Sequence, residues 1–305
     1  MQSATSSGSR ISQPPNRPDC TGVRGIARDL AAAGLGRLIA PVESVLTEAG
    51  APIVSVRTDD REGCPAFFAR SVSGVSNGAS PEWMQALLTK AGLRPISALV
   101  DITNYFSIGF GRPLHVYDVA KLQGGLVARR AVDGESIEAL NGKTYTLDSS
   151  MTVIADDAHV HDIAGIMGGM ASGVSENTTD VLIEAAYFDP ARIGATGRAL
   201  GLTSDARARF ERGVDPAFVA AGLDLAAAMV VDLCGGQVSQ IAKSGSPPVA
   251  DKTVVFDPAL TLGLGGIDVV ADEQRLILER LGFVVTGDIP WKVSVPSWRR
   301  DVDGP

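Results

Sequence analysis

The stretch RPISALVDITNY, residues 94–105, is followed by GRPLH at 111–115, GIMGG at 165–169 and LIE at 182–184. Together these segments contain one of only three histidines, a neighbouring hydroxyl and amide, a glycine turn, and a carboxylate preceded and followed by apolar residues. This combination indicates a pocket for a small ligand with a polar head group, set in a fold of mixed strands and helices.

The sequence on either side of these segments predicts an α+β fold in which a mixed sheet is layered with helices. Apolar runs bounded by Gly, Pro or Asp predict strands, whereas a 3.6-residue apolar period or proline at the first helical position predicts helices. The predicted strands cover 53–56, 66–72, 124–132, 152–155 and 181–188, and the predicted helices cover 21–34, run from Pro81 to Gly92, begin at Pro95, begin after Asp189, and run from Pro216 to Cys234. These elements show no regular βαβ repeat.

The chain predicts two unequal globular parts after a leader. Residues 1–17 are rich in Ser, Pro and Gln without an apolar core, which is typical of a disordered leader and not of a signal peptide. The next segments are a remnant of an N-terminal module at 18–45, the large part at 48–243 and a Ser/Gly/Pro linker at 244–248. A small truncated part follows at 251–305, with a predicted helix at 271–281 and a predicted hairpin of 283–285 and 292–295.

Composition excludes several classes of protein. Hydrophobic residues make up 45% of the 305, enough for a substantial core, and aspartates interrupt the longest apolar segment at 217–234, so no membrane span is expected. Three widely spaced cysteines favour reduced thiols in the cytoplasm over a disulfide framework. The net charge of −8 argues against a nucleic-acid binder that acts through its overall field. A local basic patch is available at Arg192, Arg198, Arg207, Arg209 and Arg212, although these side chains could instead form a solvated face paired with Asp205, Glu211 and Asp215.

A further motif is TSDARARFERGVDP at 203–216. Together with the segments at 94–105, 111–115, 165–169 and 182–184, it makes the chain resemble the beta subunit of bacterial phenylalanyl-tRNA synthetase over residues 18–305. The resemblance implies that residues 48–243 are an editing and tRNA-binding domain, that the small part is winged-helix-like, and that the chain is a fragment of a longer subunit. It further implies hydrolysis of mischarged tyrosyl-tRNA(Phe). The implied partners are tRNA(Phe), its tyrosine or phenylalanine moiety and the synthetase alpha subunit; ATP and magnesium belong to the full ligase, and no cofactor is expected within this fragment.

Glu184 and His115 are the residues best suited to editing chemistry. An apolar pocket that binds phenylalanine rejects tyrosine, which merely adds a hydroxyl, by only about 10²-fold. A second, hydrolytic site must therefore offer that hydroxyl a polar partner. The resemblance gives this role to Glu184, whereas the alternative is that its side chain points outward from the strand. His115 could act as general base, position a water or bind the terminal ribose, or it could be a structural histidine.

Four further residues complete the expected pocket. Thr103 and Asn104 could hold the amino-acid head group or the attacking water, or they could cap the end of a helix. Gly168 and Gly169 could offer backbone N–H groups to a carbonyl oxygen that gains negative charge, or they could simply form a turn.

Two metal interpretations are weaker. His159 and His161 lie two residues apart, but two ligands without a third make a poor site, so we predict a surface strand here. The stretch Val160-His161-Asp162 stands where the resemblance implies more apolar residues, a departure that concerns the electrostatics of the pocket and not the fold. The resemblance makes Asp301 a magnesium ligand in the full-length enzyme; alone it does not provide the octahedral oxygen ligation that magnesium requires.

Two other functions remain open. The segment could be a non-catalytic scaffold that docks RNA and the partner subunit, with a vestigial pocket. It could also be a free-standing aminoacyl-tRNA deacylase, although the sequences at 15–28 and 253–301, which match the longer subunit, argue against that.

Overall fold

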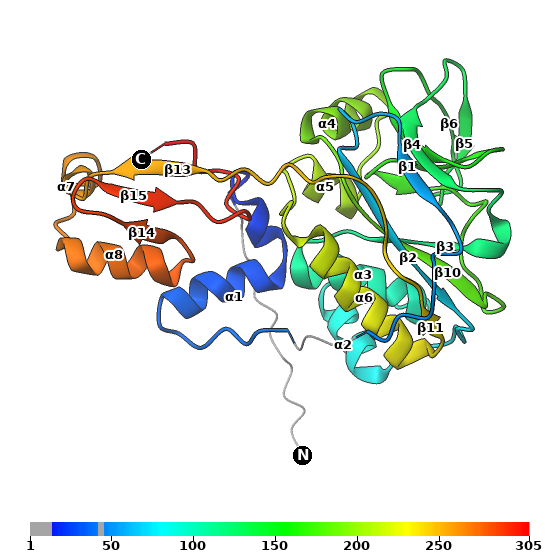
Figure 1. Cartoon of the computed structure of the whole chain (residues 1–305), viewed down its shortest axis with the longest axis horizontal. Helices are drawn as coiled ribbons and strands as arrows, with labels where there is room; N and C mark the ends of the chain where they lie inside the picture. The colour runs from blue at the N-terminus through cyan, green and yellow to red at the C-terminus, as the bar shows by residue number, and fades with distance from the viewer. Residues whose placement is uncertain (1–13, 42–45, 305) are drawn as a thin grey trace.

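The computed structural model describes residues 14–41 and 46–304. Figure 1 shows two bodies of unequal size with helix α1 (Val23–Ala32) between them. Residues 1–13 of the predicted leader and 42–45 of the predicted remnant lie outside the described residues. The described end of the leader is tied down, because the guanidinium of Arg17 pairs with Asp19 at 2.8 Å and with Asp29 at 2.9 Å.

An antiparallel sheet forms the middle layer of the large body. In spatial order its strands are β11 (Gln237–Val238), β2 (Ala66–Ser73), β10 (Asp180–Tyr187) and β3 (His115–Asp118), and β12 (Ala242–Gly245) pairs with β2 further along the same edge as β11. All of β10 after Asp180 is buried, which shows that both faces of this sheet are covered. A carboxylate in the middle of β10 is therefore held inside the protein.

Helices cover one face of this sheet. Helix α6 (Phe218–Cys234) packs on β2 and β10, and α3 (Ala98–Phe110) packs on α6, as Figure 1 shows. Helix α3 ends at Gly111, whose φ of +67° is a left-handed conformation that glycine adopts without strain. The turn at Gly111 reverses the chain into β3, and this connection brings His115 onto the sheet.

A second sheet covers the opposite face. Its strands in spatial order are β1 (Val56–Thr58), β4 (Leu126–Arg130), β7 (Thr152–Ala155), β8 (Val160–Ile163) and β9 (Met167–Gly168). Strands β1 and β4 are parallel and the other pairs are antiparallel. The remaining elements of the large body are α2 (Glu82–Lys90), η2 (Val119–Lys121), the hairpin of β5 (Ser136–Glu138) and β6 (Thr144–Thr146), α4 (Pro190–Ala199) and α5 (Asp205–Phe210).

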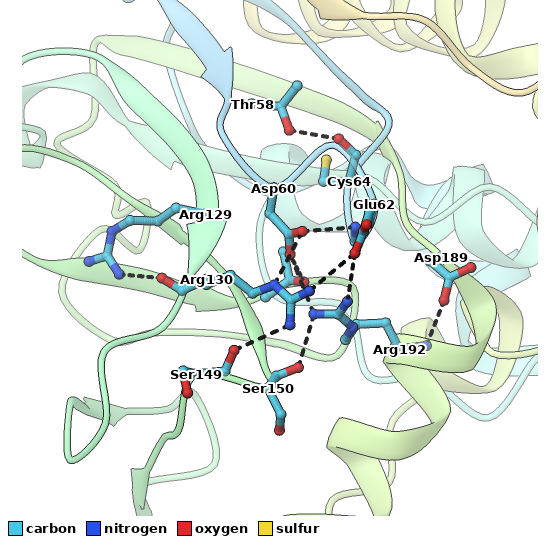
Figure 2. Close-up of polar contacts among 12 residues, drawn as sticks. Thr58, Asp60, Glu62, Cys64, Arg129, Arg130, Ser149, Ser150, Asp189 and Arg192 are labelled. Atoms are coloured by element: carbon cyan, nitrogen blue, oxygen red, sulfur yellow. Dashed lines mark hydrogen bonds and ion pairs between the residues drawn. The ribbon is translucent and has the colours of Figure 1, made fainter.

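A polar network ties the second sheet to α4 (Figure 2). The buried carboxylate of Asp60 accepts hydrogen bonds from the hydroxyl of Thr152 at 2.7 Å and the backbone N–H of Gly63 at 3.1 Å. Two guanidiniums lie beside it, that of Arg130 at 3.4 Å and that of Arg192 at 3.6 Å. Because these groups come from β4, β7, α4 and the loop after β1, the network fixes that end of the large body.

The small body has its own core of Phe283, Val285, Trp291 and Val293. It consists of a three-stranded antiparallel sheet in the order β13 (Thr253–Phe256), β15 (Trp291–Ser294), β14 (Val284–Thr286), with α7 (Ala259–Gly265) and α8 (Ala271–Arg280). Helix α1, which follows the 3₁₀ turn η1 (Pro18–Thr21), contacts both α3 and α8 and so touches both bodies.

The predicted α+β class is confirmed, while several predicted boundaries are wrong. Residues 53–55 are not in a strand, since β1 begins at Val56. The helix expected from Pro95 begins at Ala98, so Ile96 lies outside it and is exposed instead of lying on the face of Leu99. Part of the predicted linker belongs to β12, whose backbone completes the hydrogen bonding of β2. No described helix is long and apolar enough to cross a lipid bilayer.

Candidate functional site

A cavity of about 80 Å³ lies between the two sheets of the large body. Its polar lining consists of His115, Asp162, Gly168 and Glu184, and its apolar lining includes Ile154, Ile166, Met167, Phe188 and Phe210. The predicted residues His115, Gly168 and Glu184 thus meet in one place, although they are up to 69 positions apart in the chain.

Strand pairing places the two principal side chains. Glu184 of β10 lies directly opposite His115 of β3, so the two side chains extend from the same face of the sheet, toward the cavity. Glu184 is 6% exposed, which contradicts the alternative in which its side chain points outward to solvent. The side chain of His115 is 27% exposed and therefore reaches the mouth of the cavity.

Gly168 leaves the room that His115 occupies. A Cβ atom at this position would lie 2.6 Å from Cε1 of His115 and 3.0 Å from Oδ1 of Asp162, far closer than van der Waals contact. Gly169 plays no such role at the cavity. Its backbone N–H donates to the carbonyl of His161 at 2.6 Å, so this group is not free to bind a ligand oxygen, and Gly169 is not in the lining of the cavity.

Thr103 and Asn104 lie in the middle of α3 and not at its end, so neither caps the helix. The hydroxyl of Thr103 donates to the carbonyl of Val100 at 2.8 Å. Neither side chain is part of the cavity lining.

Tyr117 and Asp162 are site residues that the sequence prediction missed. The fully buried hydroxyl of Tyr117 hydrogen-bonds with Oδ2 of Asp162 and with Oε2 of Glu184. Nε2 of His115 lies 3.4 Å from Oδ1 of Asp162. Two signals were present in the sequence, because Tyr117 shares the strand face of His115 two residues earlier and Asp162 is a charge where an apolar residue was expected.

Burial dominates the electrostatics of this group. It raises the pKa of Asp162 and of Glu184 well above the ordinary carboxyl range, and the charge of Asp162 raises the pKa of Glu184 further. Burial also lowers the pKa of His115 below its ordinary value, against the opposing effect of the Glu184 charge. His115 is therefore a neutral imidazole at pH 7, able to accept a proton.

His161 corrects the prediction of a surface strand. It is fully buried in β8, and its Nε2 lies 2.7 Å from the Asp156 carboxylate, whereas His159 is exposed and outside the strand. Burial opposes ionisation of Asp156, but hydrogen bonds from His161 and three backbone N–H groups outweigh it and lower the pKa. Within residues 14–41 and 46–304, neither histidine belongs to a cluster of three potential metal ligands.

Asp301 is bound to Arg299 through two hydrogen bonds of 2.8 and 3.0 Å. Burial opposes its ionisation, yet the guanidinium of Arg299 lowers its pKa overall. In the described part of the chain, Asp301 is not grouped with two other potential ligands. These residues therefore do not fit a magnesium ion by themselves.

The predicted basic patch is largely neutralised. Arg207 pairs with Glu211 at 3.0 Å, and the buried Arg209 pairs with Asp205 at 3.2 Å. Arg192 belongs to the Asp60 network of Figure 2. Arg198 at the end of α4 is exposed.

The large body matches a known domain. The family model described as the B3/4 domain covers residues 63–235, a span that includes every residue lining the cavity. The chain belongs to the B3/4 domain family. It is also 61% identical over 292 residues to a protein named phenylalanine–tRNA ligase beta subunit from Novosphingobium aromaticivorans, covering 95% of this chain and 36% of that protein. A protein of the same name from Zymomonas mobilis is 54% identical over 290 residues, covering 94% and 36%.

These relatives confirm the predicted resemblance to the synthetase beta subunit. The chain spans 36% of the length of these two curated relatives. A solved N-terminal fragment of the phenylalanyl-tRNA synthetase beta subunit from Pyrococcus horikoshii aligns over 95% of this chain and 81% of its own, with 15% identity and a TM-score of 0.43, too distant to inform the site.

Proposed function

We propose that this B3/4 chain is part of a phenylalanine–tRNA ligase beta subunit and that its cavity hydrolyses tyrosyl-tRNA(Phe). The observation that carries the proposal is the meeting of His115, Gly168 and Glu184 around one small cavity with apolar walls. Tyrosine fits this chemistry because its ring is apolar and its hydroxyl is a hydrogen-bond donor. The name of the relatives supports the tRNA context, and the residues around the cavity support ester hydrolysis as the reaction.

Glu184 is the proposed reader of the tyrosine hydroxyl. A carboxylate accepts the phenol proton, whereas phenylalanine leaves it without a partner in a buried site. Hydrogen bonds to a charged group are worth about 1.5–3 kcal/mol, which corresponds to roughly ten- to a hundredfold in discrimination. The apolar walls accept either ring, so the hydroxyl alone distinguishes the two substrates.

His115 is the proposed base. A neutral imidazole at the cavity mouth can accept a proton from a water that attacks the ester, and it lies where the aminoacyl end of a tRNA would enter. Thr103, Asn104 and the N–H of Gly169 have no direct role in this proposal, because they lie outside the cavity lining or are already bonded.

The wider assembly belongs to the full-length enzyme. We propose that the alpha subunit, tRNA(Phe), ATP and magnesium are its partners and cofactors, that Asp301 becomes a magnesium ligand only there, and that it acts in the cytoplasm. Exposed Arg198 is the member of the basic patch best placed to contact RNA.

A single-turnover deacylation assay tests the proposal. Protein in excess is mixed with tyrosyl-tRNA(Phe) or phenylalanyl-tRNA(Phe), and the loss of the ester is followed against hydrolysis without protein. We expect acceleration for the tyrosyl ester and little for the phenylalanyl ester. A folded protein that binds tRNA(Phe) yet accelerates neither reaction would establish the scaffold function instead.

A further inference from the structure

Two buried carboxyl groups share one hydroxyl at the inner end of the cavity. Tyr117 is fully buried, Asp162 is 5% exposed and Glu184 is 6% exposed. The hydroxyl oxygen of Tyr117 lies within hydrogen-bonding distance of one oxygen from each carboxyl group. The three groups come from β3, β8 and β10, so both sheets contribute to this cluster.

Counting protons constrains the charge of the cluster. A tyrosine hydroxyl carries one proton and can donate to only one acceptor, while ionised carboxylates only accept. If both carboxyl groups were ionised, one of the two contacts would bring a negative oxygen against an oxygen lone pair. Both contacts are hydrogen bonds only when one carboxyl group is protonated and donates to Tyr117, while Tyr117 donates to the other.

We propose that Asp162 and Glu184 hold one proton between them through Tyr117, and that Asp162 is a positioning residue that sets the charge with which Glu184 meets the hydroxyl of a ligand. The identity of that ligand rests on the proposed function, but the shared proton does not. The cluster then carries a single negative charge, although it contains two carboxyl groups.

The surroundings of the pair agree with a single charge. Toward Asp162 lie His115 of β3 and His161 of β8, and toward Glu184 lie His115, Arg112 and Cys64. Arg112 is fully buried, and burial lowers its pKa to about 10, so it still carries its charge at pH 7. His115 and Cys64 are neutral there, because burial lowers the pKa of the imidazole and raises that of the thiol.

Within the described residues, two atoms at the cavity have no hydrogen-bond partner. These are Oδ1 of Asp162 and Nε2 of His115, which lie 3.4 Å from each other. A water or polar ligand atom beside this pair could bond to both atoms. Besides the bridge through Tyr117, Asp162 therefore keeps a second carboxyl oxygen in a residue that lines the cavity.

The shared proton makes discrimination depend on pH. Burial and mutual repulsion keep the last proton on the pair to a higher pH than usual for carboxyl groups, and it is lost as the pH rises. Only ionised Glu184 accepts the phenol proton without donating one. We expect the ratio of tyrosyl to phenylalanyl ester hydrolysis to rise as the pair loses its last proton and then to level off.

The first experiment measures the proton directly. Side-chain carboxyl carbons of Asp and Glu are labelled with carbon-13 and titrated by NMR in the wild type, in Asp162→Asn and in Glu184→Gln. We expect the pair to keep one proton above the ordinary carboxyl range, and Glu184 in Asp162→Asn to titrate at lower pH than in the wild type. Two carboxyl groups that both ionise within the ordinary carboxyl range in the wild type would overturn the inference, and this result needs no variant to fold.

The second experiment measures the consequence. The ratio of deacylation rates, each corrected for uncatalysed hydrolysis, is followed from acidic to neutral pH in the wild type, in Asp162→Asn and in the matched control Asp288→Asn, which changes an exposed aspartate. We expect the rise of the ratio to move to lower pH in Asp162→Asn, because Glu184 then loses its proton earlier, and an unchanged profile in the control. Identical profiles in all three proteins would contradict a role for Asp162 in setting the charge of Glu184.

The two experiments separate the two proposals. A shared proton without deacylation would leave the carboxyl pair standing and remove the proposed function. Deacylation that depends on Glu184, with two independent carboxyl titrations, would keep the function and remove the pair.

Discussion

At the scale of single residues, the site depends on one cross-strand pair. Glu184 and His115 lie opposite each other in the pairing of β10 with β3, so the backbone fixes their separation before any side chain is packed. Glu184 lies at the inner end of the cavity and hydrogen-bonds with Tyr117, while His115 reaches the cavity mouth. In the proposed function, the inner residue Glu184 recognises the tyrosine hydroxyl and the outer residue His115 accepts the proton.

Removing the carboxylate should narrow discrimination. Glu184→Ala should reduce the ratio of tyrosyl to phenylalanyl ester hydrolysis by roughly ten- to a hundredfold, since the hydroxyl loses a hydrogen bond to a charged group. Glu184→Gln should retain part of the ratio through its amide. The measurement is the ratio of deacylation efficiencies, with Glu176→Gln as an exposed control. A ratio that is constant in all four proteins would place recognition of the hydroxyl elsewhere.

Removing the imidazole should slow the reaction on both esters. The loss of one positioned base typically costs about 10²- to 10⁴-fold, so His115→Ala should lie in that range. Because burial lowers the pKa of His115, the wild-type rate should fall only when the pH drops below the ordinary histidine value and the imidazole becomes protonated. Replacing exposed His159 by Ala should change neither rate. Wild-type kinetics in a folded His115→Ala protein would make that histidine purely structural.

At the scale of elements, the short strand β9 places its glycine against the site. Gly168→Ala would put a methyl group 2.6 Å from Cε1 of His115, so the imidazole must move out of its position. We expect a loss of about 1–3 kcal/mol in the free energy of unfolding, as for other overpacked sites, and weaker tyrosine binding. Urea denaturation and calorimetric titration with tyrosine measure the two effects. Gly78→Ala, where the methyl group meets open space, is the control, and equal behaviour of the two variants would refute the packing argument.

The sequence predicts long elements well and short ones poorly. Helices α2, α6 and α8 are found within two residues, because their apolar patterns and caps are local. Strands β5, β6, β9 and β12 have two to four residues each, too few for an alternating pattern to stand out, and β12 pairs with the distant strand β2. The same reason explains the site: motifs reveal His115 and Glu184, but only the register shows that Tyr117 and Asp162 meet them.

At the scale of the whole molecule, the chain forms two hydrophobic cores, one in each body, and helix α1 lies between the bodies (Figure 1). The guanidinium of Arg28 in α1 lies 4.1 Å from the ring centre of Trp298, and the segment around Trp298 follows the sheet of the small body. Helix α1 therefore contacts structure near both ends of the chain. The predicted limits of the two domains, at 48–243 and 251–305, stay predictions.

The whole chain should not activate phenylalanine. It covers 36% of the length of its synthetase relatives, and its sequence contains no phosphate loop with the GxGxxG or GxxxxGK[ST] spacing. We expect no ATP–pyrophosphate exchange with phenylalanine above the background without protein. Measurable exchange by the purified chain would show that it contains an activating site of its own.

Strand β2 makes the choice of a C-terminal end critical for any shortened protein. The family match stops at residue 235, before β11 and β12, which together satisfy the outer backbone groups of β2 along Ala66–Ala69 and at Val72 and Ser73. A protein cut at 235 would present an apolar strand with unpaired N–H and C=O groups, which is a template for aggregation. We expect light scattering to show a monomer for residues 1–250 and growing aggregates for residues 1–235. A monomeric 1–235 protein would mean that another segment covers that edge.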